Sequence, residues 1–228
     1  VDPLPANAFH RLLIADQRFQ LLLSSANAAP VEQRAALIAN AYTAYTNLLN
    51  ADIGGPRAAI LGTLFARLVA VSADSAPAAS LPPIAAIAQA DRFSSQGKAE
   101  AVTILRELID NGQLPEFEHA LALFVLGKAL YAANQPLDAA EQFIALADRH
   151  PADAQAGRAI DLRVAIAAEQ RRLHPDDERA RTALARGLDV ALADFPNQPT
   201  IDQWRLIASQ LALDENRFDD AERMLKQV

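Results

Sequence analysis

The sequence predicts an all-α chain built from helical hairpins. Apolar residues recur at spacings of three and four along most of the chain, which is the periodicity of a helix with one buried face. Prolines and glycines divide this pattern into helix-length stretches. One turn pattern occurs twice, because Asn134 and Asn216 are each followed by Asp-Ala four and five residues later. This recurrence of turn chemistry before a small residue favours repeated hairpins.

Composition excludes several classes of protein. A hydrophobic content of 51% over 228 residues excludes a disordered chain. The absence of cysteine excludes disulfides, thiolate metal sites and cysteine nucleophiles. A net charge of -7 argues against non-specific binding to nucleic acid or to anionic lipid. The most apolar stretch, residues 58–73, is short and carries Arg67, so no membrane insertion is expected within this chain.

The N-terminal part is poor in charge. Residues 1–90 hold equal numbers of acids and arginines, and the whole net charge falls after them. Helices are predicted over 5–25, 31–50 and 57–72, forming an N-terminal segment of divergent hairpins or a cap over residues 1–75. A surface so low in charge is usually covered. We therefore expect it to pack against another domain, another part of the polypeptide, or a second copy in a homo-oligomer.

Residues 74–83, rich in Ser, Pro and Ala, form the clearest composition break and predict a boundary before a repeat region over 84–228. Asp176 and Thr200 are predicted helix caps, and residues 171–178 read as an insertion between two helices. His150-Pro151 and Phe195-Pro196 are predicted helix ends. The helices expected after the break are 84–93, 98–111, 116–133, 137–150, 154–173, 176–193 and 200–213.

The most informative stretch is 123–151. Its spacing comprises Leu123, Leu126-Gly127, Leu130, Ala139, Phe143 and Pro151. Gly127 and Ala139 are small enough for two antiparallel helices to approach closely, and Phe143 is expected to fill the groove between this pair and the next. Pro151 cannot continue a helix. This spacing resembles that of a tetratricopeptide repeat.

The resemblance implies a right-handed α-α superhelix of tetratricopeptide-like hairpins. Residues 123–151 match the repeat well and 204–225 recognisably, whereas 84–115 and 154–196 are degenerate. In the last repeat the Asn216 turn comes one residue later than the family relation to Trp204 allows. A lone hairpin cannot bury its apolar face, so stacked neighbours are expected to do so.

The resemblance also implies a concave groove lined by the first helix of each pair. The chain is then a non-catalytic scaffold or interaction module that binds a protein or peptide partner, or assembles a larger complex. Phe124 replaces a residue of the family's clamp for a C-terminal carboxylate, so that type of ligand is disfavoured. The predicted groove positions are Leu121, Phe124, Lys128, Tyr131, Gln155, Arg158, Arg205 and Ser209.

No nucleotide-binding or hydrolase string occurs, so no catalytic residue and no cofactor are predicted. The four histidines do not pair at helical spacing, which predicts no metal site. The arginines between 171 and 186 are interpreted as part of a salt-bridged surface. The alternative is an all-α enzyme or small-molecule binder whose groove site lies around His119, Lys128, Tyr131 and Arg158.

The sequence leaves the compartment and the partner open. It begins Val1-Asp2-Pro3 without an initiator Met, which suggests a processed or partial chain. An exported protein whose signal segment is missing is one expectation, and a cytoplasmic protein is the other. The abundance of Ala, Arg and Asp suggests a bacterial source with a GC-rich genome.

Overall fold

A computed structural model describes scattered positions between residues 14 and 26, and then residues 28–49, 78, 81–112 and 114–228. The described residues form helices and turns, with no strand among them. The chain divides into two compact units, 1–114 and 115–228. The helix expected at 57–72, most of that at 5–25 and most of the break at 74–83 lie outside the described residues.

The described helices of the first unit are α2 (Val31–Leu49), α4 (Pro83–Ser95) and α5 (Glu100–Asp110). Contacts therefore group α4 and α5 with the first unit, whereas the sequence placed them after a boundary at 74–83. Gly97 turns the chain between them at φ 70°, a conformation that costs glycine little. The small residue Ala101 and the larger Leu105 face inward on α5.

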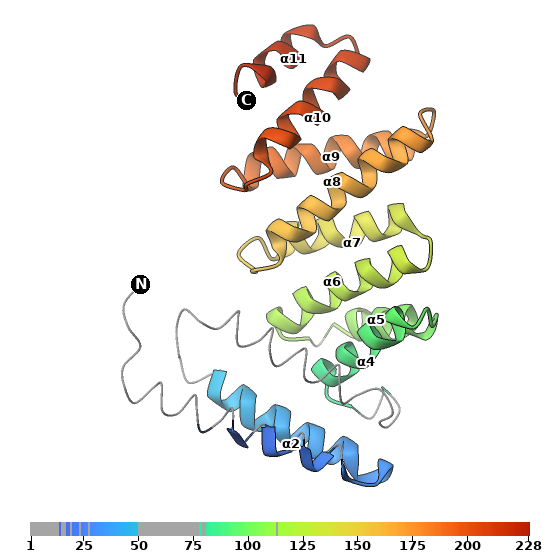
Figure 1. Ribbon diagram of the computed structural model, residues 1–228, viewed down its shortest axis with the longest axis vertical. Helices are drawn as coiled ribbons and strands as arrows, with labels where there is room; N and C mark the ends of the chain where they lie inside the picture. The colour runs from blue at the N-terminus through green and yellow to red at the C-terminus, as the bar shows by residue number, and fades with distance from the viewer. Residues whose placement is uncertain are drawn as a thin grey trace. The chain divides into compact units, whose positions relative to one another are not determined.

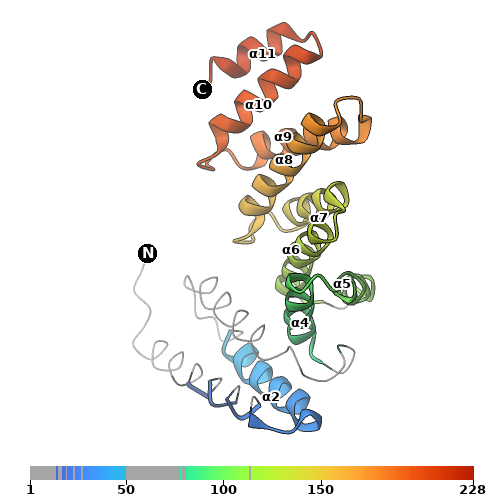
Figure 2. The ribbon, with the colours of Figure 1, turned by 45° about the vertical axis from the view of Figure 1, so that its right-hand side comes forward.

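The second unit contains α6 (Glu116–Ala132), α7 (Pro136–Arg149), α8 (Ala156–Leu173), α9 (Glu178–Asp194), α10 (Ile201–Asp214) and α11 (Phe218–Leu225). These helices follow one another in chain order, from yellow-green to red in Figures 1 and 2. Each packs against its neighbour in the chain, and α7 also packs against α9. The predicted succession of helix pairs is confirmed within this unit.

The two asparagine turns close their hairpins in the same way. Asn134 and Asn216 have φ of 59° and 58°, the left-handed conformation that asparagine tolerates better than most residues. In both turns the next amide reaches back five residues, which is the Schellman arrangement. These bonds are Gln135 N to Leu130 O, 2.9 Å, and Arg217 N to Ala212 O, 2.8 Å. The predicted equivalence of the two turns is confirmed.

Three helices end at a residue that precedes a proline. His150, His174 and Phe195 are the C-caps of α7, α8 and α9, with φ between -133° and -124°. A following proline disfavours helical backbone at such a residue, so the helix stops there. The predicted ends at His150 and Phe195 are confirmed.

The caps of α9 and α10 differ from those predicted. Asp177, not Asp176, caps α9, and its side chain accepts bonds from the amides of Arg179 (2.8 Å) and Ala180 (3.3 Å). Thr200 is the N-cap of α10 by position, but its hydroxyl donates to Asp161 instead of bonding its own helix. Of the residues read as an insertion, 171–173 lengthen α8, which continues through Leu173, and 174–177 form the turn before α9.

The α6–α7 hairpin is close-packed around Gly127. A methyl group added to Gly127 would lie 2.6 Å from a ring carbon of Phe143, far inside ordinary contact distance. The Phe143 ring also lies 5.7 Å from that of Phe124, centroid to centroid. Phe143 therefore fills space within its own hairpin, over the glycine, and the predicted need for a small residue at 127 has a direct structural cause.

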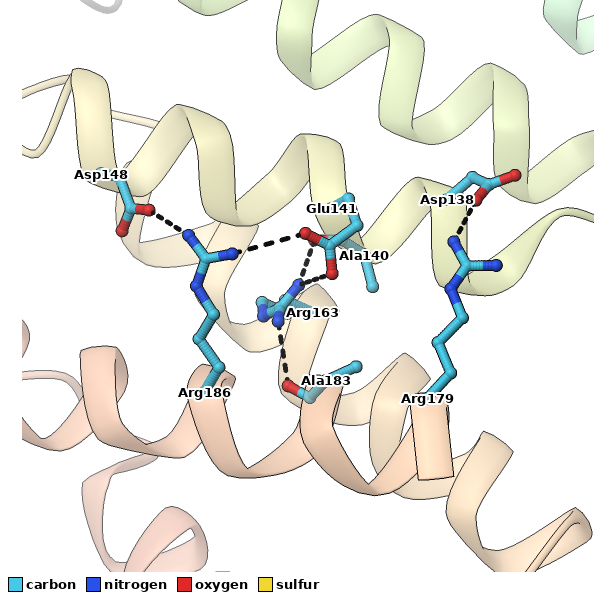
Figure 3. A network of polar contacts seen from close by, with 8 residues as sticks. All are labelled: Asp138, Ala140, Glu141, Asp148, Arg163, Arg179, Ala183 and Arg186. Atoms are coloured by element: carbon cyan, nitrogen blue, oxygen red, sulfur yellow. Dashed lines mark hydrogen bonds and ion pairs between the residues drawn. The ribbon is translucent and has the colours of Figure 1, made fainter. Parts of the chain in front are cut away.

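A buried arginine joins α7, α8 and α9 (Figure 3). Arg163 is fully buried, and its guanidinium donates to the carbonyls of Ala140 on α7 (2.7 Å) and Ala183 on α9 (3.0 Å). Glu141, half exposed, lies 3.4 Å away. Burial lowers the pKa of Arg163, but a guanidinium stays charged at neutral pH. The cost of burying this charge is offset by the carbonyls and the carboxylate.

Ion pairs run across the exposed side of the same helices. Arg186 on α9 pairs with Asp148 (2.9 Å) on α7, and Arg179 on α9 pairs with Asp138 on α7 (Figure 3). Within their own helices, Arg172 pairs with Glu169 and Arg181 pairs with Glu178. The predicted salt-bridged surface is confirmed for these four arginines.

Candidate functional site

The candidate site is the side of the second unit formed by the first helices of its hairpins, α6, α8 and α10. On α6 the predicted positions are spaced by three, four and three residues and so share one side of the helix. Leu121 and Phe124 are buried, with 4% and 6% of their surface exposed. Lys128 is exposed, and 58% of Tyr131 is exposed. The open part of this side is therefore the C-terminal half of α6.

Of the two predicted positions on α8, Arg158 contacts the middle of α6. Gln155 is the half-buried N-cap of α8, and its backbone amide donates to the Asp153 carboxylate at 2.8 Å. Arg158 is exposed, and its guanidinium carbon lies 5.6 Å from the centroid of the Phe124 ring. This is within the range of a cation–π contact. The structure thus brings together one predicted position of each helix, Phe124 of α6 and Arg158 of α8.

The α10 positions need a correction. Ser209 is buried, and its hydroxyl donates to the carbonyl of Leu206 at 2.8 Å. Arg205 is half-buried and pairs with Asp202 at 2.8 Å. The exposed stripe of α10 instead comprises Gln203, Leu206, Gln210 and Leu213.

The reason is a one-residue shift that was already visible in the late Asn216 turn. Counted back from the two asparagines, Leu206, Gln210 and Leu213 correspond to Phe124, Lys128 and Tyr131. Ser209 then corresponds to Gly127, the small residue that faces the second helix of its hairpin. The distance of each residue from the asparagine of the turn therefore predicts the exposed residues of α10 from sequence.

The three helices are linked along this side. Arg158 of α8 reaches Phe124 of α6, and the Thr200 hydroxyl at the start of α10 donates to Asp161 of α8 at 2.6 Å. Large apolar side chains are exposed on two of these helices: Tyr131 at 58%, Leu206 at 48% and Leu213 at 40%. This side therefore combines apolar groups with the cations Lys128 and Arg158.

A histidine pair lies at the other end of the α6–α7 hairpin. Nδ1 of His119 on α6 lies 2.7 Å from Nε2 of His150, the C-cap of α7. The remaining nitrogen of His150, Nδ1, lies 3.7 Å from the Glu116 carboxylate. Sequence reasoning missed this pair, because contacts between residues 31 positions apart leave no local spacing signal. No group of three or more metal-ligating side chains occurs in the described part of the chain.

Glu118 is a second titratable group on α6. It is buried, with 2% of its surface exposed, and neither carboxylate oxygen has a hydrogen-bond partner. Burial without a partner disfavours the charged form and raises the pKa of Glu118 to about 7. A carboxyl group in this state is in part protonated at neutral pH.

The residues of the alternative enzyme site are not gathered in one place. His119 and Tyr131 are separated by twelve residues of one helix, which corresponds to about 18 Å along its axis. Arg158 lies at Phe124, between them along α6. Along α6, the contact with Arg158 therefore falls near the middle of the helix, and His119 and Tyr131 lie towards its two ends.

In comparisons with known proteins, the chain matches no family model, no curated protein and no solved structure. Among the described residues, no helix has the length and apolar character needed to cross a membrane.

Proposed function

We propose that this chain is a non-catalytic protein–protein interaction module of tetratricopeptide-like type. Its partner is a protein segment that lies along α6, α8 and α10, and the module assembles that protein into a larger complex. The right-handed superhelical arrangement implied by the family resemblance is part of this proposal. So is self-association through residues 1–75.

One observation carries the proposal. Tyr131 and Leu213 occupy the same position in two different hairpins, three residues before the asparagine of the turn. Their carbonyls accept the amides of Asn134 and Asn216 at 3.0 Å in both cases. Both side chains are large, apolar and exposed. Exposed apolar groups repeated at one position of a helical array are typical of a surface that a partner covers.

The cations beside these apolar groups favour a partner that carries both apolar and acidic side chains. The Arg158 guanidinium lies over the ring of Phe124, and Arg158 is an exposed residue. Lys128 lies one helical turn before Tyr131. Aromatic residues and arginine are enriched at the energetic centres of protein interfaces. A segment that carries apolar side chains and a carboxylate would complement this face.

A displayed library of random peptides selected against the chain tests the proposal. We expect enriched peptides to bind at least about tenfold more weakly to Tyr131→Ser and to Leu213→Ser, which corresponds to about 1.4 kcal/mol for each. Arg158→Glu should weaken binding most for peptides that contain acids.

The matched control is Phe218→Ser. Phe218 is an exposed aromatic residue, 62% accessible, but it begins α11, the second helix of its hairpin. Binding that survives in this variant and is lost in the first two places the peptide on the proposed face. The proposal fails if no peptide is enriched, or if all four variants bind as well as the unmodified chain.

A further inference from the structure

The His119–His150 pair closes the open end of the α6–α7 hairpin. His119 lies in the first turn of α6, and His150 caps the C-terminus of α7. The Asn134 turn is at the opposite end of both helices. The two rings are tilted by 59°, with their centroids 5.0 Å apart. The pair is thus a side-chain link at the end where the hairpin has no covalent connection.

A contact of 2.7 Å between two ring nitrogens holds only if one proton lies between them. Glu116 indicates which ring supplies it. If Nδ1 of His119 donates to Nε2 of His150, then His150 carries its own proton on Nδ1, facing the Glu116 carboxylate. The reverse arrangement would place a lone pair of His150 against that carboxylate. The first tautomer is therefore favoured.

Acid changes this contact in two steps. A first extra proton can enter at Nε2 of His119, outside the contact, and the bond between the rings survives. A second extra proton must enter at Nε2 of His150, because its Nδ1 is already protonated. Two N–H groups, both on charged rings, then face each other and the contact cannot persist.

The surroundings oppose the charged forms. Burial lowers the pKa of His119, and the nearby His150 and Arg149 lower it further. Glu116 is the acid that faces the pair, Glu118 precedes His119 in the chain, and Asp153 donates its backbone amide to the His150 carbonyl. Glu116 is exposed, Glu118 is buried and in part protonated, and the Asp153 carboxylate is engaged by the Gln155 amide.

We propose that the His119–His150 contact is a pH-sensitive clasp, which holds the open end of the α6–α7 hairpin together near neutral pH and releases it in acid. This inference is independent of the proposed function. Because a histidine with a lowered pKa takes up its proton more readily in the unfolded chain, its stabilising effect is present above about pH 6.5. That effect falls as the pH drops towards the lower pKa of His119 in the folded state, and the contact itself opens when a second proton enters the pair at still lower pH.

Release of the clasp has a consequence for α8. The carbonyl of His150 accepts the amide of Asp153 at 2.9 Å, and the Asp153 carbonyl accepts that of Ala156 at 3.0 Å. The first turn of α8, which carries Arg158, is therefore built on the backbone of His150. A displaced His150 would loosen this turn and its contact with Phe124.

The test uses the full chain and variants that keep a polar group but cannot titrate. His119→Asn places a side-chain amide near the position of Nδ1, and His150→Gln places one near that of Nε2, so one can donate to the other. The matched control is His174→Gln, because His174 is also a C-cap before a proline but is exposed. We compare the thermal midpoint of each protein at about pH 7.5 and about pH 5, on either side of the ordinary histidine pKa.

The expected result is a larger loss of Tm in acid for the unmodified chain and for His174→Gln than for the double variant His119→Asn/His150→Gln. Glu118 is common to all these proteins, so its own pH dependence cancels in the comparison. An equal loss in the double variant and in the unmodified chain would overturn the clasp.

Nitrogen-detected NMR of the histidine rings in the unmodified chain is the second measurement, and it does not depend on any variant folding. We expect the His119 ring to titrate below its ordinary range, with Nδ1 protonated before titration and with ring signals of His150 changing in parallel. Rings that titrate independently, or a His119 with a proton only on Nε2, would contradict the clasp.

Discussion

The helices α7 and α11 follow turns of the same type but differ in how deeply their side chains are buried. Ala139 and Ala221 follow their asparagines at the same distance, and both are buried. Four residues further on, Phe143 is 1% exposed and Leu225 is 47% exposed. The second helix of one hairpin is part of a core, whereas that of the other is largely on the surface.

The difference lies in the neighbours of each helix. α7 packs against α6, α8 and α9, whereas α11 packs against α10. Turn geometry and the small residue after it are set by the local sequence, since both hairpins have them. Burial of the larger apolar residues depends on helices that come later in the chain, as expected for a repeat array.

The largest effect should come from the equivalent pair Phe143 and Leu225. Phe143→Ala removes a buried ring that packs over Gly127, and we expect a loss of about 4 kcal/mol in the free energy of unfolding. Leu225→Ala should cost less than about 1 kcal/mol, because the side chain is half exposed. Urea unfolding of both variants measures these losses. Similar losses of free energy in the two variants would contradict the proposed difference between α7 and α11.

Substitutions of Arg163 test how much the contact between α7 and α9 contributes to stability. Arg163→Ala leaves a cavity between α7, α8 and α9 and removes both carbonyl contacts, with an expected cost of about 3 kcal/mol. Arg163→Met keeps most of the volume without the charge and should cost clearly less. Chemical unfolding separates the two. A methionine variant as unstable as the alanine variant would show that the guanidinium contacts, and not packing, hold the three helices.

Glu118 and Thr200 occupy equivalent positions, sixteen residues before their turns, but only the threonine has a partner. Folding raises the pKa of Glu118 to about 7. The protonated carboxyl group therefore contributes its full stabilisation of the fold at pH values below the pKa that it has in the unfolded chain. That stabilisation is lost as the pH rises to about 7. Glu118→Gln should therefore raise stability by about 2 kcal/mol at alkaline pH and by little in acid. A benefit that is independent of pH would contradict the raised pKa.

The smallest effect concerns the feature that the hairpins share. Asn134→Ala and Asn216→Ala each place alanine in a left-handed conformation, at an expected cost of about 1 kcal/mol. Asn134→Gly and Asn216→Gly should be close to neutral, since glycine adopts this conformation freely. Thermal unfolding of the four variants checks the equivalence, which fails if the alanine change matters in only one hairpin.

Sequence predicted the features of the second unit that depend on short segments. The proline stops at residues 151 and 196, the asparagine turns and the close approach at Gly127 each have a local physical cause. The predicted cap of α9, Asp176, is wrong by one residue. Neighbouring aspartates are equally suited to capping a helix, and only the backbone conformation selects Asp177.

Features that depend on tertiary contact were not predicted, although some left a signal. Arg163 lies in step with Ala156, Ala159 and Ala167, which are all buried on α8. Helical periodicity therefore indicates the inner face for Arg163, although arginine usually lies on the surface. The His119–His150 pair left no such signal. The exposed residues of α10 follow the register of the Asn216 turn, one residue away from the predicted positions Arg205 and Ser209.

Native-state hydrogen exchange tests most directly whether neighbours, and not turns, determine how firmly each hairpin is held. The account predicts that amides of α7 and α8 exchange most slowly and those of α11 fastest, with α10 between them. Equal protection in α7 and α11, or exchange of all helices of the second unit in a single global opening, would contradict it.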